Sequence, residues 1–171
     1  MRGVIERMGR RLWASLATWP DASGWAYVAG VGGLTLAGMA AIGFSTGYYA
    51  LHPTLTAGLP GRLVSVLIAP GLGEEVPFRG LLIPSRQEAR SPWRSLVPVT
   101  VVFTLWHVVE VFTVLPAART AFLRWDFLAC AATLGVGCAL VRWRTGSLWP
   151  AVALHWLAVT IWQTWLGGFT L

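Results

Sequence analysis

The sequence predicts an all-α fold, a polytopic membrane helix bundle of about five transmembrane spans with an N-terminal interfacial helix. Of the 171 residues, 56% are hydrophobic and only 12% are charged, against roughly 25% charged residues in an ordinary soluble domain. Apolar runs of about 20 residues recur along the chain, and this length crosses the roughly 30 Å of hydrocarbon in a bilayer. Many of the 11 tryptophans stand at the ends of these runs, where interfacial aromatic belts form.

The first 20 residues predict an amphipathic helix on the membrane surface. Apolar residues recur at helical spacing among four arginines, as in helices that lie on an anionic leaflet. A cleaved signal peptide is the alternative, but the apolar run that follows, 25–51, is far longer than the 7–15 residues of a signal core. We therefore divide the chain into an N-terminal amphipathic cytoplasmic segment, 1–24, and a single membrane domain, 25–171, whose first span is retained.

Four further runs are long enough to cross the bilayer: 59–84, 96–115, 121–141 and 147–166. The run 59–84 is interrupted by Pro70, Pro77 and several glycines, and the run 121–141 is shortened by Arg124 and Asp126. With these boundaries, nine arginines fall on the side of the N-terminus and three on the other side. The positive-inside rule then predicts a cytoplasmic N-terminus and an external C-terminus, in a membrane that we expect to be the prokaryotic inner membrane.

The composition argues against a nucleic-acid-binding protein and against a disulfide between the two cysteines. All 13 basic residues are arginine, and they do not form a basic stripe interleaved with stacking aromatics, so we expect no nucleic-acid partner. Cys130 and Cys138 are eight residues apart in one apolar run, about 12 Å along a helix. That separation is too long for a disulfide, and the two residues are expected to be buried small hydrophobes.

Charged side chains at bilayer depth are costly and therefore indicate a functional site. The run 59–84 contains three of them, Glu74, Glu75 and Arg79. Glu75 and Arg79 are four residues apart, so they share a helix face and can pair. A closed ion pair serving only packing would need one acid, and the second acid, Glu74, is left for chemistry.

Two histidines lie at a similar depth in other spans. Counted from one membrane face, Glu74, His107 and His155 are about 15, 16 and 12 Å deep at 1.5 Å per residue. A single histidine in an apolar helix is most often a hydrogen-bonded core residue. Three polar groups at one level are instead predicted to meet in one buried cavity, with Glu110 one turn beyond His107.

In combination, Glu74-Glu75-x-x-x-Arg79, Phe103-x-x-x-His107 and His155 resemble the motifs of the CPBP family of intramembrane proteases, which includes type II CAAX prenyl endopeptidases and bacterial Abi-type proteins. The likeness covers residues 60–166. It implies a glutamic endopeptidase that needs no metal or cofactor, with a membrane-anchored protein or peptide as substrate. Glu74 and His107 would activate water, His155 would stabilise the oxyanion, and Glu75 and Arg79 would form a supporting pair.

One position departs from the family pattern. The family has Asn or Asp four residues after the last histidine, where this chain has Val159. Valine cannot donate a hydrogen bond to an oxyanion. We therefore expect His155 to carry this role alone or with a water or backbone helper, while Val159 only packs.

Three alternatives remain open from the sequence. Two Glu and two His could hold zinc in a metalloprotease, although the HExxH motif of zincins is absent. The same cluster could bind an ion or peptide without cleaving it, in an immunity-type or transport protein. The substrate could be a prenylated CAAX protein, a C-terminal sorting tag, a signal remnant or a peptide pheromone.

Overall fold

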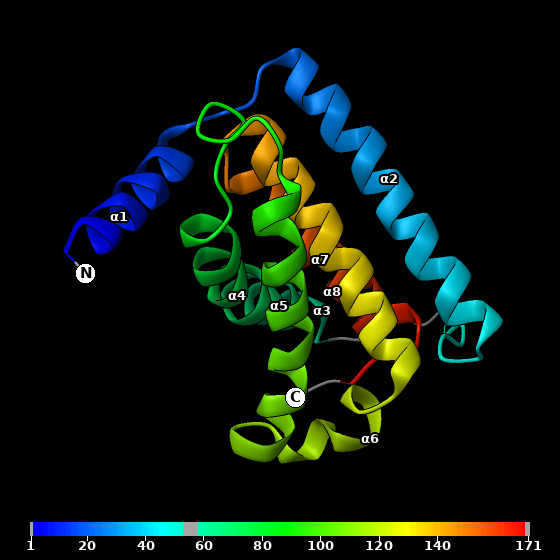
Figure 1. The fold of residues 1–171 in the computed structure, drawn as a ribbon. Coiled ribbons are helices and arrows are strands. Elements are labelled where there is room, and N and C mark those ends of the chain that lie inside the picture. Colours follow the sequence, from blue (N-terminus) through cyan, green and yellow to red (C-terminus); the bar gives the residue numbers. More distant parts are fainter. Residues whose placement is uncertain (1, 53–57, 170–171) are drawn as a thin grey trace.

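The structure, a computed structural model, describes residues 2–52 and 58–169, and the regular elements in these two ranges are all helical (Figure 1). The predicted all-α fold is therefore confirmed. The elements in chain order are α1 (Arg2–Ala17), α2 (Ala22–Ser45), α3 (Leu59–Val66), η1 (Leu67–Leu72), α4 (Gly73–Glu75), η2 (Val76–Leu81), α5 (Trp93–Thr113), η3 (Pro116–Ala118), α6 (Arg119–Phe122), α7 (Trp125–Thr145) and α8 (Trp149–Trp165).

Within the described ranges, three helices are long and apolar enough to cross a membrane: α2 with 24 residues, and α5 and α7 with 21 each. The outer face of α5 is apolar and exposed, with Val101, Leu105 and Phe112 each more than half exposed. Such a face suits lipid, because large exposed apolar patches are rare in soluble monomers. The helix α8, with 17 residues, and the segmented helix Leu59–Leu81 were the other two predicted spans, so the count of five stays a prediction.

The bundle is built around α7, which packs against α2, α5 and α8. Glycines on α7 allow close approach of its neighbours, as is typical of helix contacts in membranes. A Cβ on Gly137 would collide with the Thr35 side chain of α2, and one on Gly135 would lie 3.1 Å from the Phe103 ring of α5. These small residues allow α2 and α5 to pack closely on α7.

The helical segment Leu59–Leu81 runs through two π-helical pieces, η1 and η2, which flank α4. Pro70 lies inside η1, and Pro77 lies in the first turn of η2. Proline has no N–H to donate, and its ring crowds the carbonyl four residues back. Backbone N–H groups here instead donate to carbonyls five residues back, which widens the helix. The Gly73 N–H, for example, donates to Ile68 O, five residues back. The widened turns place Glu74 and Glu75 on the short α4 between them.

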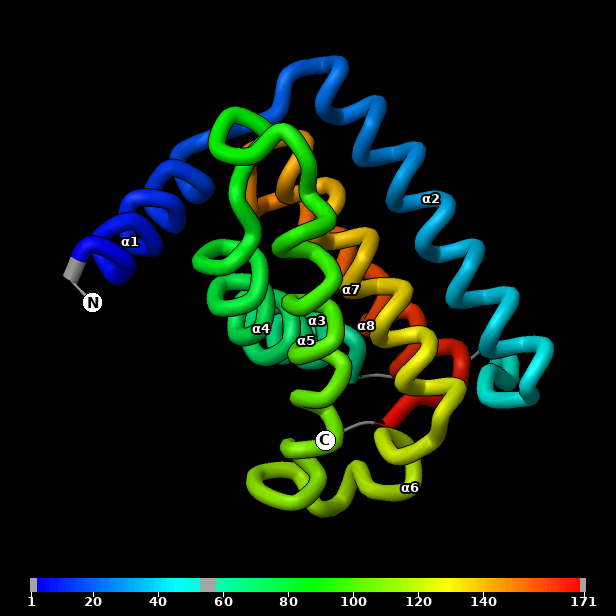
Figure 2. Tube along the Cα trace, in the orientation of Figure 1, coloured from blue at the N-terminus to red at the C-terminus, as the bar shows by residue number. Residues whose placement is uncertain are grey.

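The two ends of the bundle are built from different elements, as the path of the chain in Figure 2 shows. At one end, α1 and the loop 82–92 meet the α7–α8 turn: the Leu148 N–H donates to Ser15 O at 2.9 Å, and Arg11 pairs with Glu88 at 2.9 Å. Burial alone would raise the pKa of Glu88, but hydrogen bonds from the Ser85 N–H and the Arg11 guanidinium outweigh it and lower that pKa. We call this the arginine-rich end, because its elements carry Arg10, Arg11, Arg86, Arg90, Arg94, Arg142 and Arg144. The opposite end holds the last turns of α2 and α5, η3, α6 and the end of α8.

The helix α1 forms as predicted and packs on η2, where Leu12 approaches Gly80 closely. Its Val4, Ile5 and Trp13 are at least half exposed. This apolar face suits the membrane interface, and its place there stays a prediction.

Topology reporters test the orientation. Fusions after residues 20, 90 and 145 should be read as cytoplasmic, and fusions after residues 50, 118 and 171 as external, because the arginine-rich end is retained inside. A pair of reporters that differ in compartment, such as one active only in the cytoplasm and one only outside it, provides the measurement. An external signal after residue 90 would reverse the orientation.

Candidate active site

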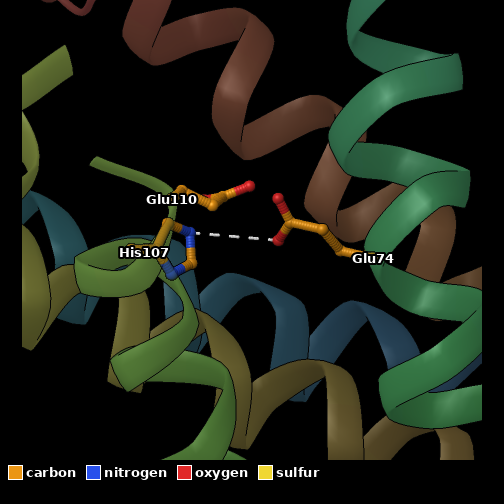
Figure 3. A group of neighbouring side chains, drawn as sticks. All are labelled: Glu74, His107 and Glu110. Carbon is orange, nitrogen blue, oxygen red and sulfur yellow. Dashed lines mark ion pairs between the residues drawn. The ribbon is translucent and has the colours of Figure 1, made fainter. Parts of the chain in front are cut away.

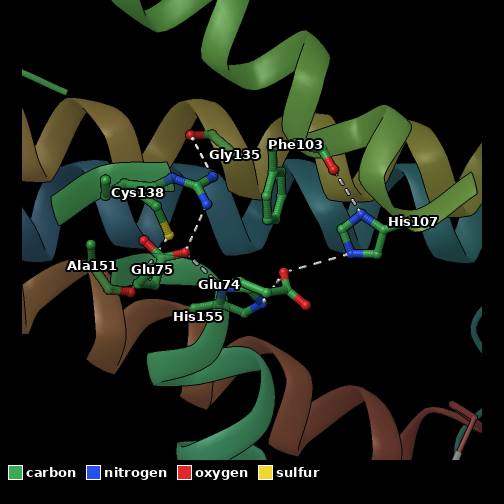
Figure 4. Close-up of polar contacts among 9 residues, drawn as sticks. Glu74, Glu75, Phe103, His107, Gly135, Cys138, Ala151 and His155 are labelled. Atoms are coloured by element: carbon green, nitrogen blue, oxygen red, sulfur yellow. Dashed lines mark hydrogen bonds and ion pairs between the residues drawn. The ribbon is translucent and has the colours of Figure 1, made fainter. Parts of the chain in front are cut away.

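The structure brings Glu74, His107 and His155 together from α4, α5 and α8 (Figure 4). Glu74 Oε2 lies 3.9 Å from Nε2 of His107 and 3.9 Å from Nε2 of His155. Both separations exceed a direct hydrogen bond of about 2.7–3.2 Å. The carboxylate thus faces two imidazole nitrogens across a gap that a small reactant can bridge.

Glu75 accepts hydrogen bonds from both Arg79 and His155 at the base of the site. Its Oε1 accepts a hydrogen bond of 2.9 Å from Arg79 Nη1 and one of 2.7 Å from His155 Nδ1–H. The Arg79 guanidinium also donates to Gly135 O at 3.3 Å and lies 4.0 Å from the centroid of the Phe103 ring. Glu75 and Arg79 are fully buried, and losing one partner of such a pair costs about 3–5 kcal/mol.

His107 is oriented by its own helix. Its Nδ1–H donates to Phe103 O, one turn back, at 3.0 Å, since a carbonyl can only accept. In the neutral ring, Nε2 then carries a lone pair, and this is the atom that faces Glu74. The Phe103 ring packs edge-on against both His107 and His155, with centroids 5.0 and 5.9 Å away. Phe103 therefore packs against both imidazoles.

Glu110 lies one turn along α5 from His107, and its carboxylate faces that of Glu74 (Figure 3). One donor atom from each of Glu74, His107 and Glu110 lies within 4.8 Å of the others. Two carboxylates and an imidazole are ligands that zinc accepts. The geometry therefore allows a metalloprotease as well as a metal-free protease.

A cavity of about 280 Å³ adjoins these residues. Its walls are mostly apolar and aromatic, and the Phe122 and Phe127 rings stack with centroids 4.4 Å apart beside Trp162. Glu74, His107, Glu110 and His155 supply polar groups in the lining. An apolar pocket with a few convergent polar groups is typical of a binding or catalytic site.

Position 159, where the family has Asn or Asp, and its neighbours on α8 lie beside the cavity or pack against α3. Val159 lines the cavity, as the helical spacing predicts. The Trp156 indole N–H donates to Leu63 O at 2.8 Å, so this donor is committed to packing α8 against α3. Gln163 also lines the cavity, although it is two turns from His155, about 12 Å along the helix.

Two features of the site were not found from the sequence. The contact between Glu75 and His155 joins residues 80 positions apart, and no local spacing indicates it. The contacts of Phe103 with Arg79 and His155 were likewise not predicted. Cys130 and Cys138 are free and buried, as expected.

Comparison with known protein families gives a match. The sequence model of the family described as "Type II CAAX prenyl endopeptidase Rce1-like" matches residues 56–161, more than half of the chain. The matched range contains Glu74, Glu75, Arg79, His107 and His155. No curated protein and no solved structure matched. Together with the three apolar helices, the match identifies an integral membrane protein that belongs to the Rce1-like type II CAAX prenyl endopeptidase family.

Proposed function

We propose that the chain is a metal-independent intramembrane endopeptidase of the glutamic type, which hydrolyses a peptide bond near the C-terminus of a membrane-associated substrate. The observation that supports it most is the position of the Glu74 carboxylate, 3.9 Å from Nε2 of two histidines and in the lining of an apolar cavity. We also propose that the protein lies in a prokaryotic inner membrane with its N-terminus in the cytoplasm.

Glu74 is the proposed general base. A water between Glu74 and His107 transfers a proton to the carboxylate, and its oxygen bonds to the carbonyl carbon of the scissile peptide. The lone pair on His107 Nε2 accepts a hydrogen bond from the same water and orients it. When the tetrahedral intermediate collapses, the C–N bond breaks, and the proton held by Glu74 passes to the leaving amine.

His155 is the proposed oxyanion donor. Its Nδ1–H is already bonded to Glu75, so its Nε2 can donate only when the ring is an imidazolium. The Glu75 carboxylate in contact with Nδ1–H fixes the orientation of the ring. Glu75 is thus a positioning residue that acts through His155, and Arg79 holds Glu75 in place.

A comparison of membrane-protein termini tests the proposal. Cells that carry the active chain should contain membrane proteins or peptides with shortened C-termini, and cells with Glu74→Gln should contain the uncut forms. Glu6→Gln is the matched control, because Glu6 is exposed on α1, away from the site. Mass spectrometry of purified membranes identifies the termini and the amount of each variant.

Identical termini in all three strains, with equal amounts of protein in the membrane, would refute proteolysis. The polar cluster would then serve binding or transport, as the non-enzymatic alternative holds.

A further inference from the structure

The helix α1 is attached to the end of the segmented helix that carries the two acids of the site. Arg11 Nη1 donates to Leu81 O at 2.9 Å, and Leu81 is the last residue of η2. A Cβ on Gly80 would lie 2.7 Å from Leu12 Cδ1, so α1 and η2 are in close contact at this point. Gly80 and Leu81 directly follow Arg79, which pairs with the buried acid. The position of α1 is therefore coupled to the end of the helix that holds both acids.

The same helix also holds the start of α8, which carries His155. The Leu148 N–H donates to Ser15 O, and the Trp149 indole N–H donates to Leu16 O, each at 2.9 Å. Leu148 and Trp149 begin α8 about two turns before His155. Ser15 and Leu148 have no exposed surface, so this contact excludes water. One short helix thus joins the ends of both helices, although it supplies none of the described lining residues of the cavity.

The apolar face of α1 continues beyond these contacts. Val4, Ile5 and Leu12 lie on one face at helical spacing, and Leu12 is partly buried against η2, whereas Val4 and Ile5 are exposed. Figure 1 shows the N-terminal turns of α1 projecting away from the other helices. Arg7 and Arg10 are exposed on α1 and form no ion pair with an acid of the described ranges. An apolar strip with free arginines beside it is complementary to an anionic leaflet, where guanidinium groups pair with lipid phosphates.

We propose that α1 binds anionic lipid with its N-terminal turns and thereby holds η2 and α8 in the positions that cleavage requires. This inference rests on the proposed function. Lipid binding and docking take place on one helix, so each favours the other: a helix kept at the leaflet surface stays beside the ends of η2 and α8. Anionic lipid therefore raises the fraction of chains with α1 docked, and with it the cleavage rate. The helix is a positioning element that acts through η2 and α8.

Paired arginine variants test the lipid contact. Arg7→Gln with Arg10→Gln removes two charges from α1, and Arg90→Gln with Arg94→Gln removes two exposed charges from the same end of the bundle but not from α1. Each full-length chain is reconstituted in vesicles of phosphatidylcholine, alone or in a roughly two-to-one mixture with the anionic lipid phosphatidylglycerol. Docking is measured by hydrogen–deuterium exchange in a peptide that contains Leu148, whose N–H is bonded to α1. Cleavage is measured as kcat and KM on a cut substrate.

We expect phosphatidylglycerol to slow exchange at Leu148 and to raise kcat by about five- to tenfold in the unchanged chain, since each arginine near an anionic surface contributes about a fivefold preference for it. KM should change little, because α1 lies outside the described cavity lining. The variant without Arg7 and Arg10 should lose most of this response, and the variant without Arg90 and Arg94 should keep it. An equal response in both variants would overturn the lipid contact of α1.

Leu12→Ala separates docking from charge. It shortens the side chain that packs on Gly80 and leaves the charge of α1 unchanged. Exchange at Leu148 should become about threefold faster, and kcat should fall by a similar factor, in both kinds of vesicle. Faster exchange with an unchanged kcat would overturn the coupling of α1 to the site. Exchange measures docking without catalysis, so a chain whose exchange responds to lipid but which cuts nothing would refute the proposed function and not the lipid-dependent docking.

Discussion

Replacing Glu74 with Gln should lower the cleavage rate by about 10²–10⁴-fold, the contribution of a positioned general base. The amide has the shape of the carboxylate but cannot take a proton from water. His107→Ala should lose activity over a similar range, because the water loses the acceptor that orients it. Initial rates of purified protein in lipid vesicles, with a substrate found by terminal mapping, provide the measurement. The variants must insert in the same amount as the unchanged chain.

Glu110→Gln separates the metal-free mechanism from the metal mechanism. Glu110 shares the donor cluster with Glu74 and His107, and a zinc ion held by that cluster would have Glu110 as a ligand. Without a metal, Glu110 is only a neighbour of the water, and its amide should retain activity within about tenfold, well above the loss expected for the general base. Strong chelators should leave the rate unchanged. Inhibition by chelator that zinc reverses, with Glu110→Gln as inactive as Glu74→Gln, would establish a metalloprotease instead.

His155→Ala should reduce the cleavage rate by about 10²–10³-fold, as the loss of an oxyanion donor does in other hydrolases. Val159→Ala should keep most activity, because a valine side chain makes no hydrogen bond to the oxyanion. Val159→Asn should be tolerated or faster, since it adds a donor one turn from His155 on the cavity side. The Trp156 indole is bonded to Leu63 O and cannot replace the missing donor.

The same rate assay measures these effects. A Val159→Ala chain that inserts normally and is as inactive as His155→Ala would contradict this division of roles. The apolar side chain would then have to shape the substrate pocket.

The sequence by itself determined the fold class and the local pairings. Apolar runs of spanning length predicted the helices, because a bilayer leaves no other way to satisfy the backbone of an open chain. The four-residue spacing of Glu75 and Arg79 predicted their contact, since 3.6 residues per turn place them on one face. A common depth for Glu74, His107 and His155 likewise followed from the rise per residue, which is a property of each helix alone.

Only the tertiary structure decided how the helices are rotated against one another. That rotation depends on close packing at particular small residues, such as Gly135 against Phe103 and Gly137 against Thr35, and no periodicity within one helix reports it. It brings His155 to Glu75 across 80 residues of sequence. It also gathers side chains of α4, α5, α7 and α8 around one cavity. Depth was local and could be counted along each helix, whereas the cavity is formed by side chains from several helices at once.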